Sequence, residues 1–227
     1  MIIEHNGHTV EFKLPQYYKK IGVNCSGGAD SAILLYAVCK YIKDENLDVT
    51  VNVITCSNDL KDRWNGRKAA DVINFIVEEL DFKNFDIHYV YYRDAQAVEY
   101  FHEVEGKLFQ DGRIQAMVSG ITQKPMTGDT TIENIEGKIV QLRDVVLPDR
   151  ETPNMPIWDG NYWNPMANID KKFVAHMFDY FGVRDTLLPL TRSCEAKPLG
   201  RFDPDFEQTP CGKCWWCLER KWAFGEY

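Results

Sequence analysis

Residues 21–31 read Ile21-Gly22-Val23-Asn24-Cys25-Ser26-Gly27-Gly28-Ala29-Asp30-Ser31, and this stretch decides the fold. It predicts a short apolar strand, a tight turn at two adjacent glycines, and a helix. The glycines let the backbone approach a ligand closely. The first N–H groups of a helix lack intrahelical partners, and the helix dipole adds positive potential there. With the hydroxyls of Ser26 and Ser31, these groups predict a phosphate-binding loop, although an ordinary strand–turn–helix capped by Asp30 or Ser31 is the alternative.

Strands and helices alternate along the first half of the chain. The expected strands are 21–25, 49–55, 85–92 and 114–120, and the expected helices are about 29–43, 63–80 and 97–110. This alternation predicts an α/β fold with a doubly wound parallel sheet. The buried face of the second helix should be formed by Ala70, Ile73, Val77 and Leu80.

Three of the predicted strands end in polar or small residues. Because ligands bind beyond the carboxyl ends of parallel strands, 26–31, 56–58 and 119–122 should meet at one site. Small residues such as Gly120 leave room there for a flat ligand.

Two segments flank this core. Residues 1–14 alternate around Asn6-Gly7, which predicts a β-hairpin. His5 and His8 beside that turn should face solvent, since no third metal ligand is in view. Residues 123–168 form a Pro- and Trp-rich irregular insertion with one strand-like piece at 138–146.

The aromatic residues of the insertion allow two readings. Trp158, Tyr162 and Trp163 either stack on a planar substrate ring or pack the insertion against the sheet. The sequence favours neither reading over the other.

A further helix should begin near Lys171. Asn168 or Asp170 is a suitable N-cap, and Gly182 is a suitable stop. The charge of Lys171 suits a triphosphate or a developing pyrophosphate. A solvated surface lysine is the alternative, because Lys172 lies beside it.

The carboxyl-terminal segment holds four of the seven cysteines, at Cys194, Cys211, Cys214 and Cys217. Such clustering predicts a metal site rather than disulfides. Four thiolates suit a closed, structural zinc site. An iron–sulfur cluster is the chemical alternative, and a metal-free cluster of buried cysteines is the other. Cys25, Cys39 and Cys56 are isolated and are expected to be core residues.

Composition bounds the class of protein. The chain has 227 residues, 44% hydrophobic and 26% charged, with a net charge of −8. That charge argues against an extensive nucleic-acid surface. No apolar run is long enough to span a membrane, and the amino terminus does not resemble a signal peptide. We therefore expect a cytoplasmic protein with no membrane partner.

The string Ser-Gly-Gly-x-Asp-Ser at Ser26–Ser31 resembles the signature of the PP-loop ATP pyrophosphatases. The resemblance implies an adenine nucleotide alpha hydrolase-like fold that binds ATP through Ser26, Gly27, Gly28, Asp30, Ser31 and Gly120. It also implies cleavage of ATP between the α and β phosphates, with Asp30 near Mg²⁺, a role that suits a carboxylate oxygen.

The carboxyl end narrows the resemblance. Thr191-Arg192-Ser193-Cys194, followed by Cys211-Gly212-Lys213-Cys214-x-x-Cys217-Leu218-x-Arg220, is similar to the end of the 7-cyano-7-deazaguanine synthase (QueC) family, and Lys171 is similar to a lysine of that family. The resemblance implies an ATP-dependent C–N ligase of queuosine biosynthesis. Such an enzyme adenylates 7-carboxy-7-deazaguanine and uses ammonia to form the amide and then the nitrile, often as a homodimer. It implies catalytic roles for Asp30, Ser31, Lys171 and Arg192, and Zn²⁺ bound by the four cysteines.

The departures from that family concern the acceptor pocket. Tyr91–Ala95 replaces an Arg-Asn pair, Gly120–Pro125 replaces a Tyr-Pro-Asp-Cys-Arg type segment, and Glu195 replaces a tyrosine. The ATP chemistry therefore transfers better than the acceptor. Another acceptor, nucleobase thiolation and a non-catalytic ATP- or partner-binding module stay open. We expect a catalytic domain over 1–190 and a zinc-binding segment over 191–227.

Overall fold

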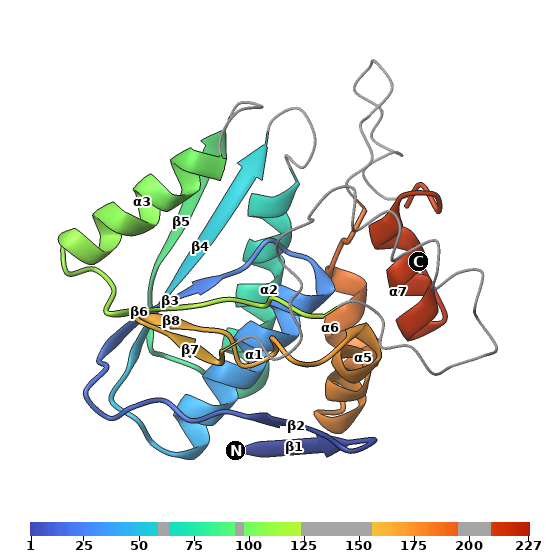
Figure 1. Cartoon of the computed structure of the whole chain (residues 1–227), viewed down its shortest axis with the longest axis horizontal. Coiled ribbons are helices and arrows are strands. Elements are labelled where there is room, and N and C mark those ends of the chain that lie inside the picture. The colour runs from blue at the N-terminus through green and yellow to red at the C-terminus, as the bar shows by residue number, and fades with distance from the viewer. Residues whose placement is uncertain (59–63, 94–97, 124–155, 195–209) are drawn as a thin grey trace.

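The computed structural model describes residues 1–58, 64–93, 98–123, 156–194 and 210–227 (Figure 1). The strands of its main sheet are β3 (Lys20–Asn24), β4 (Thr50–Asn58), β5 (Phe85–Arg93), β6 (Ala116–Val118), β7 (Trp158–Asp159) and β8 (Tyr162–Trp163). Their order in this six-stranded sheet is β5-β4-β3-β6-β8-β7. Neighbouring strands are parallel, except that β7 and β8 are antiparallel. The predicted parallel α/β sheet is confirmed.

Helices cover both faces of this sheet (Figure 1). One face carries α1 (Ala29–Asp44), α2 (Asn65–Leu80) and α5 (Lys171–Tyr180), and the other carries α3 (Val98–Gln110). Two separate apolar clusters result: a large one that includes most of α1, and a smaller one in which Leu108 of α3 meets Ile54 and Met117 of the sheet. The arrangement is doubly wound, as the alternation of strands and helices predicted.

Leu80 is buried in α2 as predicted, but the other three residues expected on this face, Ala70, Ile73 and Val77, lie one position after the buried ones. The buried apolar residues are Ala69, Val72, Ile76 and Leu80, whereas Val77 is 41% exposed. Apolar residues occupy adjacent positions along this helix, so two stripes fit the same periodicity. Packing against α1 and β4 selects one of them.

The amino-terminal hairpin is confirmed. β1 (Ile2–His5) and β2 (His8–Glu11) pair antiparallel around Asn6 and Gly7, whose φ angles of 48° and 78° fit a tight hairpin turn. His5 is not simply solvent-facing, because its ring stacks on that of His176 in α5 with centroids 3.9 Å apart.

The expected irregular insertion is partly regular. Residues 124–155, including the strand-like piece at 138–146, lie outside the described residues. Within the described part, β8 extends the main sheet beside β6, and β7 pairs back onto β8 through a turn at Gly160, with φ +57°. Strands this short show no periodicity in a sequence, so only the sheet reveals them.

After β8 the chain forms α5, which lies on the face of the sheet that also carries α1. Asp170 caps α5 by accepting hydrogen bonds from Lys172 N–H (2.9 Å) and Phe173 N–H (3.2 Å), as one of the two predicted caps. After α6 (Arg184–Leu187) and the 3₁₀ turn η2 (Leu188–Leu190), residues 191–194 run beside α1. The last helix, α7 (Trp215–Phe224), packs against α5.

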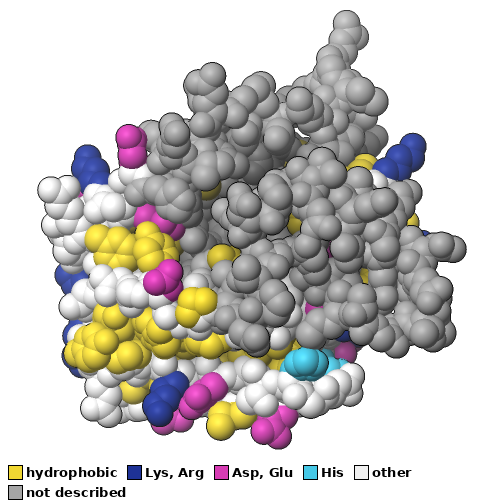
Figure 2. Space-filling model, in the orientation of Figure 1, with side chains coloured by type: hydrophobic (Ala, Val, Ile, Leu, Met, Phe, Trp, Pro, Cys, Tyr) yellow, Lys and Arg dark blue, Asp and Glu magenta, His cyan; other side chains and the backbone are white. Residues whose placement is uncertain are grey.

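The described surface shows no concentrated positive charge on the face in Figure 2, where Lys and Arg side chains lie scattered among acidic and neutral ones. In the part of the chain that the structure describes, no helix combines the length and the apolar character needed to cross a membrane. The division of the chain near residue 190 stays a prediction.

Candidate active site and metal centre

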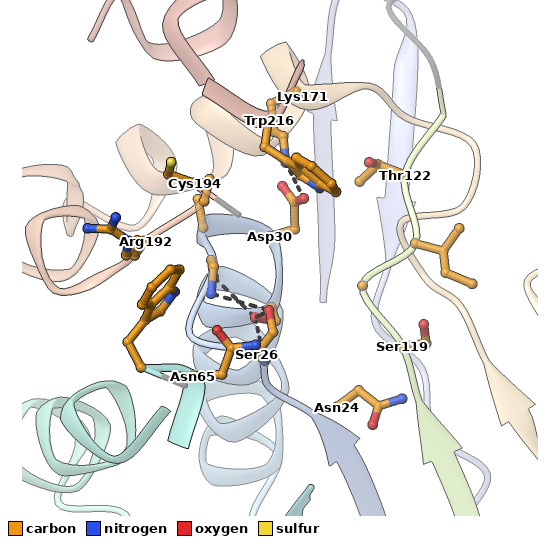
Figure 3. A pocket seen from close by; sticks show the side chains of 17 residues that line it. Asn24, Ser26, Asp30, Asn65, Ser119, Thr122, Lys171, Arg192, Cys194 and Trp216 are labelled. Atoms are coloured by element: carbon orange, nitrogen blue, oxygen red, sulfur yellow. Dashed lines mark hydrogen bonds and ion pairs between the residues drawn. The ribbon is translucent and has the colours of Figure 1, made fainter. Parts of the chain in front are cut away.

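A cavity of about 280 Å³ lies at the carboxyl ends of β3 and β6 (Figure 3). From β3 the chain continues to β4 on one side, and from β6 it continues to β7 and β8 on the other side. Doubly wound sheets bind ligands at the point where the strand order reverses in this way. The wall gathers residues that the sequence singled out separately: Ser26, Gly28, Asp30, Ser31, Gly120, Lys171, Arg192 and Cys194. The strand-end segment 119–122 lines it as expected, whereas Cys56 and Ser57 do not.

The loop between β3 and α1 is held by its own serines. Ser31 Oγ donates to the Gly28 carbonyl (3.1 Å) and accepts from the Ser26 N–H (3.1 Å). Ser26 Oγ accepts from the Gly28 N–H at 3.3 Å. The first intrahelical bond of α1 runs from Ala32 N–H to the Gly28 carbonyl, so the N–H groups of residues 29–31 precede it and suit an anion.

Gly27 does not line the cavity but allows the loop to exist. Its φ of +76° is unfavourable for other residues. A Cβ at this position would lie 2.4 Å from Lys68 Cβ of α2. The loop is therefore pressed against α2 at a point where only glycine fits.

Lys171 is a buried cation at the start of α5, with 4% of its surface exposed. Burial and the positive end of the helix dipole both disfavour a charge there. Two carboxylates offset this cost: Lys171 Nζ contacts Asp30 Oδ2 (Figure 3) and lies 3.7 Å from Glu219 Oε2 of α7. The surface-lysine alternative is wrong, because tertiary contacts bury the side chain.

Asp30 has one carboxylate oxygen beside Lys171 and one with a different environment. Asp30 Oδ1 is buried and has no hydrogen-bond partner among the described residues. A hard carboxylate oxygen in that state suits Mg²⁺ or a donor group of a ligand. The loop, Asp30 and Lys171 thus offer anion-binding and cation-binding groups side by side.

Arg192 connects this loop to the cysteine segment. Its backbone N–H donates to the Gly27 carbonyl at 2.8 Å. Its guanidinium lies over the Trp64 indole, 4.4 Å from the ring centroid, and points away from Asp30 (Figure 3). Arg192 is thus part of the cavity wall, but its guanidinium does not point toward Asp30.

The four predicted metal ligands come together. The sulfur atoms of Cys194, Cys211, Cys214 and Cys217 all lie within 4.8 Å of one another. Two of the separations are 3.9 Å, between Cys211 and Cys217, and 4.0 Å, between Cys214 and Cys194. Within the described residues, these four cysteines form the cluster of candidate metal ligands that the fold brings together.

The spacing of these sulfurs tests which metal fits. Four sulfurs around one ion at about 2.3 Å form a tetrahedron with edges of about 3.8 Å. The observed separations match a single tetrahedral ion. In a [4Fe–4S] cluster each thiolate binds a different iron atom, and in a [2Fe–2S] cluster the two pairs of thiolates bind different irons, so both require a wider arrangement than a single ion. The donor set and its spacing therefore fit one mononuclear metal ion.

Known proteins resemble the chain only distantly. No family model matches the sequence, and no curated protein matches it. Among solved structures, the U34-tRNA thiolase NcsA from Methanococcus maripaludis with its [4Fe-4S] cluster has a TM-score of 0.46 at 13% identity. That match covers 83% of this chain and 61% of the thiolase, so the chain spans less than two thirds of that protein.

Two synthetases also match. NMN synthetase from Francisella tularensis has a TM-score of 0.42 at 12% identity, covering 94% of this chain and 79% of that one. NAD⁺ synthetase from Burkholderia pseudomallei has a TM-score of 0.31 at 12% identity, covering 92% and 76%. At these levels of similarity the matches say nothing about substrate or reaction, and the chemistry rests on the site itself.

Three wall residues escaped the sequence analysis: Trp64, Asn65 and Trp216. Asn65 begins α2, and helix starts in a parallel sheet share the edge where strands end, so this position was open to prediction. Trp216 lies between two metal ligands in sequence, which was a second available signal.

Other candidates lie outside the wall. Trp158 and Trp163 stack on each other with ring centroids 5.4 Å apart, and the Tyr162 hydroxyl donates to Glu105 at 3.2 Å. None of the three lines the cavity, which favours the packing reading. Cys25 is 1% exposed and belongs to the large apolar cluster, and burial raises the pKa of its thiol to about 11, as expected for a core residue.

Proposed function

We propose that the protein is an ATP-dependent ligase that activates a carboxylate as an acyl adenylate and joins it to ammonia. The observation that carries the proposal is the contact between Asp30 and Lys171 beside the loop of Ser26–Ser31. An anion-binding loop, a buried cation and an acidic residue in one cavity are what polyphosphate transfer requires.

In this proposal the loop binds the phosphates of ATP. The N–H groups at the start of α1 and the Ser26 hydroxyl donate to phosphate oxygens, and Ser31 keeps the loop in shape. Asp30 Oδ1 would hold Mg²⁺, which supplies neutralising charge for the phosphates. Lys171 stabilises the negative charge that develops on the departing pyrophosphate.

The proposed reaction forms one bond and breaks one bond at each step. An oxygen of the acceptor carboxylate attacks the α phosphorus, the bond from that phosphorus to the α–β bridging oxygen breaks, and pyrophosphate leaves. Ammonia then attacks the acyl carbon, AMP leaves with the C–O bond electrons, and the excess proton passes to solvent. The product is a primary amide.

The finer proposal is the QueC reaction on 7-carboxy-7-deazaguanine. The amide oxygen attacks the α phosphorus of a second ATP and pyrophosphate leaves; cleavage of the C–O bond then releases AMP, and loss of the two N–H protons to solvent gives the nitrile. Arg192 is proposed to support the acceptor carboxylate or the α phosphate from the back of the cavity. Another carboxylate acceptor is the alternative, since Gly120 and its neighbours depart from that family.

The metal is proposed to be Zn²⁺, bound by the four cysteines and structural in role. Four protein ligands leave no position for a reactive water. Nucleobase thiolation gains no support at the site. Cys194 is the cysteine among the described residues that line the cavity, and it is one of the four proposed metal ligands.

The deciding experiment measures the products of ATP cleavage. Purified protein is incubated with Mg·ATP, ammonium and 7-carboxy-7-deazaguanine, and nucleotides and products are identified by mass spectrometry. AMP, pyrophosphate and the amide or nitrile are expected. ADP and phosphate would contradict the proposed chemistry, whereas AMP formed only with another carboxylate would contradict the acceptor alone.

A further inference from the structure

Adjacent tryptophans at the start of α7 have different environments. Trp215 is 7% exposed and belongs to the buried residues, whereas Trp216 is partly exposed and lines the cavity. Figure 3 shows Trp216 beside Lys171 and Asp30, with Thr122 on its other side. A large apolar side chain therefore lies among the polar groups of the phosphate site.

The position of Trp216 is fixed from two directions. Its ring stacks on Trp215 with centroids 4.3 Å apart and an interplanar angle of 27°. Along the chain it lies between Cys214, the N-cap of α7, and Cys217, and both belong to the four-cysteine cluster. A metal ion that binds those sulfurs holds the indole in place before a ligand arrives.

We infer that Trp216 is a binding residue for the acceptor: its indole stacks against a flat aromatic ring that carries the reacting carboxylate. This inference rests on the proposed function, since it assigns the second substrate of the same site. It also links metal binding to acceptor binding, because the ion would fix the position of the residue that contacts the acceptor.

The other indole in the wall is less suited to this task. Trp64 is 3% exposed, and the Arg192 guanidinium already covers one face of its ring. Trp216 stacks on Trp215, is partly exposed and lines the cavity. Its place beside Lys171, which contacts the loop residue Asp30, puts a stacked ring next to the phosphates.

The test measures the affinity of each substrate separately. Metal-loaded protein is titrated with 7-carboxy-7-deazaguanine or with ATP, and binding is followed by calorimetry and by quenching of tryptophan fluorescence. The variants are Trp216→Ala, Trp216→Leu, which keeps the bulk without a ring, and Trp216→Phe, which keeps a ring. Trp222→Phe on the same helix is the matched control, because Trp222 does not line the cavity.

Loss of the ring should weaken acceptor binding about tenfold or more in the Ala and Leu variants. The Phe variant should recover most of this loss, and ATP affinity should stay within about twofold. Unchanged acceptor affinity would overturn the inference. Weaker ATP binding in place of weaker acceptor binding would also overturn it, because the ring on Trp216 would then be adenine.

A second probe separates this inference from the proposed function. If the protein does not bind 7-carboxy-7-deazaguanine, indole-3-carboxylate offers the same combination of flat ring and carboxylate. Binding of either acid that depends on Trp216 supports the inference even if no AMP forms. Absence of such binding for both acids rejects it, whatever the products of ATP cleavage.

Discussion

The phosphate loop and the cysteine tail face one cavity but are stabilised in opposite ways. The loop is held by hydrogen bonds among neighbours, from Ser26 to Ser31, and by the helix that follows it. The tail brings Cys194 together with cysteines beyond the segment 195–209, and we propose that a metal ion bound to the four sulfur atoms holds it in place. Local backbone geometry defines the first region, and in our proposal metal ligation defines the second.

This difference predicts different responses to change. A loop built from local contacts should persist when the metal is removed, whereas α7 and its side chains should lose their position. Arg192 joins the two regions through its hydrogen bond to Gly27, and Lys171 joins them by contacting both Asp30 and Glu219 of α7. Loss of the tail should therefore reach the loop through these contacts.

Replacing a metal ligand should have the largest effect. Cys214→Ser removes one of four ligands, and the binding energy of such a site, on the order of 10 kcal/mol, is also folding energy. We expect loss of about one equivalent of metal per chain and protease sensitivity of the carboxyl-terminal segment. Elemental analysis and limited proteolysis measure both. Cys39→Ala, a core substitution, should keep its metal, and a metal-free wild type of equal stability would contradict the prediction.

Gly27 and Gly7 provide a matched pair that tests the loop. Both have φ near +77°, at +76° and +78°, but a Cβ at Gly7 meets nothing within 4 Å. Gly7→Ala should cost about 1 kcal/mol through backbone strain alone. Gly27→Ala adds the clash with Lys68 and should cost about 3 kcal/mol or more. Denaturant unfolding measures the free energies, and equal losses would show that the loop can move away from α2.

Asp30→Asn should reduce AMP formation about a hundredfold or more, which is about 2.7 kcal/mol of transition-state stabilisation. The amide weakens both the Mg²⁺ site and the contact with Lys171, while the loop bonds do not involve this side chain. Asp44→Asn at the opposite end of α1 is the control. Normal turnover in Asp30→Asn would remove this carboxylate from the chemistry, and circular dichroism checks that the fold is intact.

Arg192→Ala should reduce AMP formation about tenfold, or 1.4 kcal/mol, without releasing the metal. Its guanidinium lies on Trp64 and points away from Asp30, so we expect a smaller loss of activity than in Asp30→Asn. Steady-state rates together with metal content decide the outcome. Metal loss in this variant would mean that Arg192 stabilises the tail instead of the reaction.

The smallest expected effect is a pH dependence of folding stability that arises from His88 in β5. Burial lowers the pKa of His88, whose Nε2 lies 2.7 Å from Thr55 Oγ1. The unfolded chain then binds a proton that the folded chain does not, so stability falls as pH drops below about 6.5. Melting temperatures at two pH values should show a smaller drop in His88→Gln. Acid would release the metal from the wild type and from His88→Gln alike, so the difference between their drops isolates the contribution of His88. Equal drops in the two proteins would show that the loss of stability has another cause.

Much of the fold could be read from local patterns. The hairpin at Asn6-Gly7, the alternation of strands and helices and the cap at Asp170 are local, and each was predicted. The prediction for the buried face of α2 was right at Leu80 and wrong by one position at the other three residues, because two adjacent stripes satisfy the same period. β7 and β8 were missed, since pairing and not residue pattern makes such short strands.

By itself, the sequence determined the loop, the set of four clustered cysteines and the parallel core of the sheet, because each depends on residues close together or on a recurring local pattern. The tertiary structure alone decided which side chains meet. It buried Lys171 between Asp30 and Glu219, turned Arg192 onto Trp64, and placed Trp216 in the cavity instead of Trp158 or Trp163. Those contacts join segments far apart in the chain, and their geometry follows from how whole helices pack.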